Sequence, residues 1–395
     1  MPEESLWNRR FVFLLLAQAG FGFSYSSFLM LPKWMATDLE AGPESIGAVV
    51  AVSALSIVAF LVPAGTMVDR HGRKAFLVGG ALLMTVSSVG YVLVHEIGLY
   101  LYVLRLLQSL AFAFAWTAGA ALCVDAAPPQ RLGQAIGLFG LCYVVMGAFA
   151  PAAVETIVGI GGWDAAFLLG AGAAAVCAGL SLFVREAPAE ASTAAPVPLA
   201  AIVADPVMLR AAVVIGLVGI AFGCAFNFHQ PYALDLGIHE LRDFFIANSV
   251  AAAACRLGLG PFIDRIGLRR VSLASLALYG VVIFAMSRLD VFGLVALGLC
   301  MGVAHGLFYP SYSATVLEGC PAAERGRRMA MLQAGLNVGI ATSGIVLGGV
   351  AARFGYPAIF QLSAGALAVA VLLIALDPRR AARPAVLAAT PGRTR

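Results

Sequence analysis

Charged side chains are scarce in this 395-residue chain: Asp, Glu, Lys and Arg make up 12% of the residues, whereas apolar residues make up 61%. A water-soluble domain of this length needs far more charge to cover its surface. The excess apolar residues must therefore face something other than water. This composition excludes an ordinary soluble domain and indicates a protein embedded in a lipid bilayer.

Several chemical signatures are also missing from the sequence. The seven cysteines form no CxxC pair and have no histidine at ligand spacing, so we interpret them as small core residues. No phosphate-binding glycine loop, nucleophile–histidine–acid arrangement or basic stripe with interleaved aromatic residues is recognisable. We therefore expect no enzymatic activity, catalytic residues, cofactor, metal or nucleic-acid partner.

Long apolar runs occupy most of the chain. A helix needs about 20 mainly apolar residues to cross a bilayer, and twelve such segments are present. They lie at 10–32, 44–66, 75–94, 98–122, 133–157, 164–184, 208–230, 242–263, 271–288, 291–316, 329–352 and 356–376. The sequence thus predicts an all-α membrane protein with two six-helix halves at 1–185 and 208–378. We expect a cytoplasmic linker at 186–207 and a basic cytoplasmic tail at 379–395.

The basic residues predict the orientation of these helices, because loops on the cytoplasmic side are rich in Lys and Arg. When both termini are placed in the cytoplasm, 19 of the 25 basic residues fall on that side. Two more lie within helices, and four fall outside: Lys33, Arg242, Arg288 and Arg353. This asymmetry predicts cytoplasmic termini and an even number of spans.

One loop occurs twice, half a chain apart. Four positions match at a displacement of 195 residues, pairing Gly65, Asp69, Arg70 and Gly72 with Gly260, Asp264, Arg265 and Gly267. Four matches at one displacement, in equivalent loops, are hard to obtain by chance. The chain is therefore predicted to be an internal repeat of two similar halves.

The first loop, Gly65-x-x-x-Asp69-Arg70-x-Gly72-Arg73-Lys74, resembles the signature loop of the major facilitator superfamily. The resemblance implies two pseudo-symmetric six-helix bundles that rock about a central cavity. It also implies that Asp69 braces the helix at 44–66 against the start of the helix at 329–352 in one state, as carboxylates are favoured at helix N-termini. Gly65 would allow a close backbone approach.

We predict that the two loops gate transport through Gly65, Asp69, Arg70, Gly72, Arg73, Asp264, Arg265 and Gly267. The alternative is a positively charged membrane anchor with a tight glycine turn. That alternative explains the basic residues but neither the aspartate nor the repeat.

Ionisable groups at membrane depth are costly and often functional. Arg105-x-x-Gln108 resembles the helix-four motif of proton-coupled efflux members, although Ser109 stands where the family has glycine. Histidine side chains titrate near neutral pH, which makes His305 a candidate proton carrier, and Glu155 follows Pro151 near the outer end of its helix. We predict proton coupling by Arg105, His305 and Glu155. The alternatives are a snorkelling arginine, a hydrogen-bonded histidine and a glutamate at the mouth of the pathway.

Polar residues that share helix faces are the candidate substrate contacts. They are Gln18, Tyr25, Gln108, Asn227, Tyr309 and Asn337. Hydrogen bonds between helices are an equally supported role for Gln18, Tyr25 and Asn337. Arg256 either pairs with a carboxylate near the inner gate or snorkels to the cytoplasm.

The favoured function is export of a small organic solute across a bacterial cytoplasmic membrane by a monomeric, proton-coupled carrier. Proton symport or facilitated uptake is the alternative, because Gly147 to Pro151 lacks most of the helix-five glycines of antiporters. A membrane sensor or scaffold without flux is a third possibility. The longest loop is only the linker, whereas such proteins usually carry a sizeable soluble domain.

Overall fold

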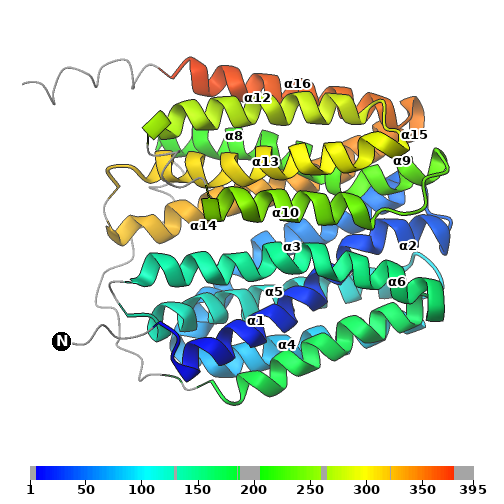
Figure 1. The fold of residues 1–395 in the computed structure, drawn as a ribbon. Helices are drawn as coiled ribbons and strands as arrows, with labels where there is room; N and C mark the ends of the chain where they lie inside the picture. The colour runs from blue at the N-terminus through cyan, green and yellow to red at the C-terminus, as the bar shows by residue number, and fades with distance from the viewer. Residues whose placement is uncertain are drawn as a thin grey trace, which may run out of the picture.

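The computed structural model describes residues 6–128, 131–184, 186, 205–258, 265–320 and 322–377. All regular secondary structure within these ranges is helical. The helices run roughly alongside one another in two bundles, and α1 begins at the same end of the molecule at which α16 ends (Figure 1).

The first bundle, called the N-half, contains α1 to α6. Its helices are α1 (Arg9–Ser27), α2 (Leu31–Thr37), α3 (Pro43–His71), α4 (Arg73–Gly90), α5 (Leu99–Ala126) and α6 (Leu132–Ser181). A short 3-10 segment joins α1 to α2, so that these two form one span. Asn8 caps α1 by accepting a hydrogen bond from the Phe11 N–H at 2.9 Å.

The long helix α6 is two membrane spans. Its 50 residues are broken at Gly162, where φ is 75°, a backbone conformation that glycine adopts without steric cost. The segment after Gly162 returns to the end at which α6 begins, where the Leu182 carbonyl accepts a hydrogen bond from Lys74. The predicted spans at 133–157 and 164–184 are therefore separate helices that meet at a sharp kink.

The second bundle, called the C-half, contains α8 to α16. Its helices are α8 (Pro206–Gly223), α9 (His229–Asp235), α10 (Arg242–Gly258), α12 (Leu268–Met286), α13 (Val291–Leu317), α14 (Ala322–Thr342), α15 (Gly348–Phe354) and α16 (Tyr356–Ala375). Two π-helical segments, η4 (Cys224–Phe228) and η5 (Ser343–Leu347), join α8 to α9 and α14 to α15. Such π-bulges occur frequently at functional sites.

The helices agree with the predicted membrane fold. Ten helical runs in the described residues are long and apolar enough to cross a bilayer. Dividing α6 at Gly162 and adding the 17-residue α10 gives the twelve predicted spans. The second bundle begins at Pro206, two residues before the predicted boundary. Residues 187–204 of the predicted linker and the predicted tail at 379–395 lie outside the described residues.

The repeated loop has the same backbone shape in both halves. Gly72 has φ 97° and ψ 140°, and Gly267 has φ 93° and ψ 136°. Both glycines immediately precede the third span of their half, so the repeat in the sequence is a repeat in the fold. Gly260 and Asp264 lie outside the described residues, and Arg265 is exposed.

Candidate functional site

The two halves meet along two seams. In one seam α3 of the N-half packs on α14, η5 and α15 of the C-half, and in the other α6 packs on α10. The first seam depends on glycine: a Cβ at Gly344 would overlap the Gly47 carbonyl, and one at Gly348 would lie 2.8 Å from the Pro43 carbonyl oxygen. Because Pro43 and Gly47 begin α3, this seam closes one end of the molecule, which we call the gate end.

A largely buried ion pair of the N-half lies at the same end and contacts the C-half. Lys33, on α2, pairs with Glu155, on α6, and the two side chains are only 12% and 11% exposed. The Glu155 carboxylate also accepts hydrogen bonds from the backbone N–H groups of Leu241 and Arg242, at 3.0 and 2.9 Å, where α10 begins. Lys33 donates a further hydrogen bond to the His239 carbonyl of the C-half at 2.5 Å.

Gln230 completes this gate cluster, which consists of Lys33, Glu155 and Gln230. The Gln230 amide donates to the Leu29 carbonyl at 2.7 Å and accepts from the Lys33 backbone N–H at 3.3 Å. Three side chains thus connect α2 and α6 to the start of α10 and to α9. The gate end is held closed by polar contacts between the halves.

The loop with the family signature lies at the opposite end, which we call the motif end. Asp69 and Arg70 are exposed and have no hydrogen-bond or ion-pair partner among the described residues. Arg73 pairs with Asp125 inside the N-half. A Cβ at Gly65 would meet nothing closer than the Thr117 side chain at 3.9 Å. The predicted close approach at Gly65 is therefore not made in this conformation.

An aromatic row crosses the middle of the N-half. Tyr25 of α1 stacks on Phe112 of α5 with ring centroids 4.4 Å apart. Phe112 continues to Trp116 at 5.7 Å, and Trp116 meets Tyr143 of α6 at 4.7 Å. Phe112 is the fourteenth residue of the 28-residue α5, so this row lies halfway along the helix.

A second aromatic row occupies the equivalent place in the C-half. Phe226 stacks on Phe222 at 4.3 Å, Phe222 meets His305 of α13 at 4.9 Å, and His305 meets Tyr309 at 6.1 Å. His305 is the fifteenth residue of the 27-residue α13. The C-half row comes from the first and fourth spans of its half, and the N-half row comes from the first, fourth and fifth spans. This arrangement is suited to binding an organic solute between the halves.

Three predicted substrate contacts have mainly structural hydrogen bonds. Gln18 is fully buried, donates to the Ala115 carbonyl at 3.4 Å and accepts from the Tyr143 hydroxyl at 2.8 Å, which connects α1 to α5 and α6. Asn227 and Asn337 each donate to a carbonyl of their own helix at 2.9 Å. The alternative role, hydrogen bonding between helices, fits Gln18, whereas Asn227 and Asn337 bond within their own helices.

Arg105 and Gln108 lie together near the gate end. The Gln108 side-chain oxygen accepts hydrogen bonds from Arg105 and from the Tyr91 hydroxyl, both at 2.9 Å. The Arg105 Nε and the Gln108 amide nitrogen are buried without a partner among the described residues. Ser109, which departs from the family pattern, donates to the Ser53 carbonyl at 3.1 Å and so connects α5 to α3.

Arg256 and His305 form a second polar group, in the C-half. Arg256 interacts electrostatically with His305 and Tyr309. Its guanidinium lies 3.9 Å from the place of a Cβ on Gly140 of α6, so it reaches across the seam to the N-half. No described residue forms an ion pair with Arg256, and the His305 Nδ1 is buried without a described partner.

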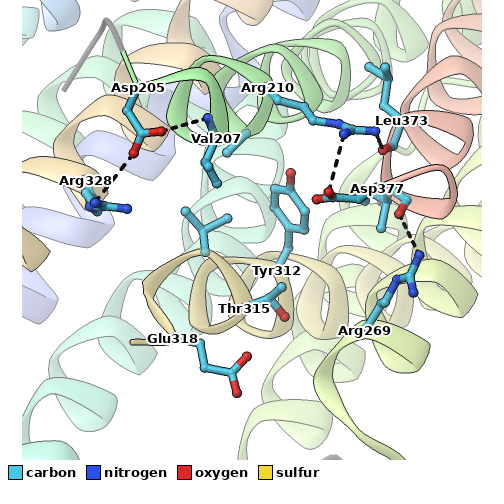
Figure 2. Close-up of a pocket in the computed structure, with 13 residues that line it drawn as sticks. Asp205, Val207, Arg210, Arg269, Tyr312, Thr315, Glu318, Arg328, Leu373 and Asp377 are labelled. Atoms are coloured by element: carbon cyan, nitrogen blue, oxygen red, sulfur yellow. Dashed lines mark hydrogen bonds and ion pairs between the residues drawn. The ribbon is translucent and has the colours of Figure 1, made fainter. Parts of the chain in front are cut away.

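A pocket of about 540 Å³ lies at the motif end, within the C-half (Figure 2). Its charges are paired: Arg328 lies 3.6 Å from Asp205, and Arg210 lies 3.5 Å from Asp377. Arg269 donates to carbonyls at the end of α16, where the helix dipole favours cations. We interpret this pocket as part of a polar clamp that connects the helix ends of one half.

Sequence reasoning missed Lys33 as a functional residue. The available signal was its position: it is one of four basic residues on the predicted outer side, and it follows Pro32. Trp116 and Tyr143 were also missed, because aromatic residues in an apolar helix carry no periodic signal that separates them from lipid-facing neighbours.

Comparison with known proteins fits this geometry. The family model for the Major Facilitator Superfamily matches residues 12–247 and 231–394. The chain belongs to the major facilitator superfamily. It is a multi-pass membrane transporter, as the signature loop and the twelve spans predicted.

Similar members of the superfamily include named exporters. A staphylopine export protein of Staphylococcus aureus is 20% identical, over 88% of this chain and 90% of its own length. The multidrug resistance protein MdtG of Klebsiella pneumoniae is 26% identical, over 83% of this chain and 82% of its own length. Among solved structures, a mutant of the nucleoside transporter NupG superimposes with a TM-score of 0.79 at 17% identity, covering 93% of this chain and 99% of that one. This last similarity shows the fold alone.

Proposed function

We propose that this transporter exports a small organic solute across the bacterial cytoplasmic membrane by alternating access, driven by proton entry. The observation that carries the proposal is the asymmetry between the two ends. The gate end is closed by Lys33, Glu155 and Gln230, whereas Asp69 at the motif end is exposed and has no partner in the described part of the chain. With the predicted cytoplasmic termini, this is an inward-facing state, from which cytoplasmic solute would enter.

The direction of transport is supported by two further observations. Arg105-x-x-Gln108 resembles the motif of proton-coupled efflux members, and the Arg105 and Gln108 side chains are hydrogen-bonded to each other. Two similar proteins are named for export and for drug resistance. Proton coupling is assigned to Arg105, His305 and Glu155, with Glu155 placed where protonation would weaken the gate.

Transport by purified protein in proteoliposomes tests the proposal. With an imposed pH gradient, a panel of radiolabelled organic solutes is expected to include one that moves against the proton flow. Replacement of Arg105 by alanine, or of His305 by glutamine, should leave passive exchange but abolish accumulation. Solute movement in the same direction as protons would establish symport instead. Flux that is independent of the pH gradient for every solute would contradict proton coupling.

Asp69→Asn tests the predicted gate at the motif end. In the opposite state Asp69 is expected to meet the start of α14, where a carboxylate stabilises by about 0.3–1 kcal/mol at exposed sites and up to about 2 when partly buried. Loss of the charge should lower the transport rate several-fold at normal expression. Asp38→Asn, an exposed change at the gate end, is the control. Unchanged transport by the Asp69 variant would contradict the gating role.

A further inference from the structure

The guanidinium of Arg256 lies at the contact between the two halves. In the described helices, the carboxylates lie within about two turns of a helix end or of the break at Gly162. Glu155, the deepest of them, already pairs with Lys33 and accepts a hydrogen bond from the backbone at the start of α10. Arg256 lies two residues before Gly258, the last described residue of α10, and fourteen residues from the gate-end start of that helix, which is about 21 Å at 1.5 Å per residue. The hydrocarbon core is about 30 Å thick, so Arg256 lies within it.

Arg256 does not reach toward the lipid. Its guanidinium lies at the α6–α10 seam, beside Gly140, which has no side chain and leaves room for it. Its electrostatic neighbours are His305 and Tyr309, the last two members of the C-half aromatic row. Because the Arg256 residue is exposed and no described carboxylate pairs with it, its positive charge is available to a ligand.

The groups around Arg256 are suited to an organic acid. A guanidinium presents a planar set of N–H donors that matches a carboxylate in a bidentate geometry. The His305 Nδ1 is a second buried polar atom without a described partner. The two aromatic rows supply flat apolar surface on which an unsaturated or ring-containing body can stack. A cationic solute, by contrast, would meet Arg256 and find no carboxylate of a described residue between the rows.

We propose that the transported solute is an organic anion with an apolar or aromatic body, and that Arg256 binds its charged group. This inference rests on the proposed transport function and names its substrate class. Arg256 is then a specificity-determining residue, and the aromatic rows contact the body of the solute. A neutral analogue would keep the stacking contacts and lose the charge-assisted hydrogen bonds.

Binding of matched ligand pairs to the purified full-length protein in nanodiscs tests this proposal. The probes are benzoate and 2-naphthoate, their neutral amides, and benzylamine and 2-naphthylmethylamine as cations. Binding is followed by quenching of tryptophan fluorescence, since Trp116 belongs to the N-half row, and by calorimetry. The carboxylates should bind at least tenfold more tightly than the amides, and the amines should bind most weakly.

Three variants test whether Arg256 is the source of the preference for carboxylates over amides. Arg256→Gln should remove the advantage of carboxylate over amide while leaving amide binding within about twofold, and Arg256→Lys should keep part of it. Arg288→Gln removes an exposed arginine at the end of α12 and should behave as the native protein. Unfolding midpoints report whether each variant is folded.

Two results would overturn the proposal. The first is that the native protein binds carboxylates no more tightly than amides, or binds no probe at millimolar concentration. The second is that the preference for carboxylates over amides persists in folded Arg256→Gln. Both are read from binding at equilibrium. They can therefore occur while gradient-driven transport is intact, which separates this failure from a failure of the proposed transport function.

Discussion

Glu155→Gln is expected to release the gate end and to reduce transport more than tenfold. The native carboxylate pairs with Lys33 and accepts two backbone hydrogen bonds from the start of α10. The ion pair lies within the N-half, but the two backbone hydrogen bonds join the halves, and a hydrogen bond to a charged group contributes about 1.5–3 kcal/mol. Since 1.4 kcal/mol corresponds to a factor of ten, the population closed at the gate end should fall at least about tenfold.

Spin labels measure this change directly. In a background without the native cysteines, labels at Asp38 and Leu236 report the separation of the halves at the gate end, where both positions are exposed. Glu155→Gln should lengthen this distance. Glu240→Gln is the matched control, since Glu240 is 72% exposed and an exposed pair contributes only about 0–1 kcal/mol. A Glu155 variant with the native distance and native transport would show that the contacts of Glu155 with the start of α10 do not hold the gate.

Gly344→Leu is expected to stop transport by keeping the gate end from closing. A Cβ at this position would overlap the Gly47 carbonyl, and its other near neighbour is the Ala51 backbone, also on α3. The overlap is with backbone, which cannot rotate away as a side chain can. All these neighbours belong to the N-half, so the substitution strains the contact between halves and leaves packing within the C-half unchanged. Because turnover needs both states, losing one of them should abolish transport.

Gly349→Leu is the control for this substitution. It lies one residue beyond Gly348 in α15, and a Cβ there would meet nothing within 4 Å. The control should transport at the native rate, and both variants should unfold near the native midpoint. Native transport by Gly344→Leu would show that the glycine contact between α3 and η5 is not part of the cycle.

The fold could be predicted from the sequence because its determinants are local. Span positions follow from continuous apolar runs, and the turns at Gly72 and Gly267 follow from a short motif that fixes a positive φ. The internal repeat was visible because both copies keep the same residues at one spacing. Even the kink at Gly162 matched a predicted break between two spans.

The site could be predicted only in part, because its determinants are contacts between distant residues. Glu155 was a candidate, but its partners are separated from it by 122 and 86 residues. Helical spacing placed Gln18 on a polar face without showing that Tyr143 and the Ala115 carbonyl satisfy it. Arg256 was ambiguous for the same reason: the proximity of Gly140 is a property of the α6–α10 seam.

The central claim is that the two halves open alternately at opposite ends, and paired distance measurements test it most directly. One label pair, Asp38 and Leu236, spans the gate end, and another, Ala75 and Arg270, spans the motif end; all four positions are exposed. When Glu155→Gln lengthens the first distance, the second should shorten in the same molecules. If the motif-end distance stays constant or lengthens together with the gate-end distance, alternating access by these two bundles is contradicted.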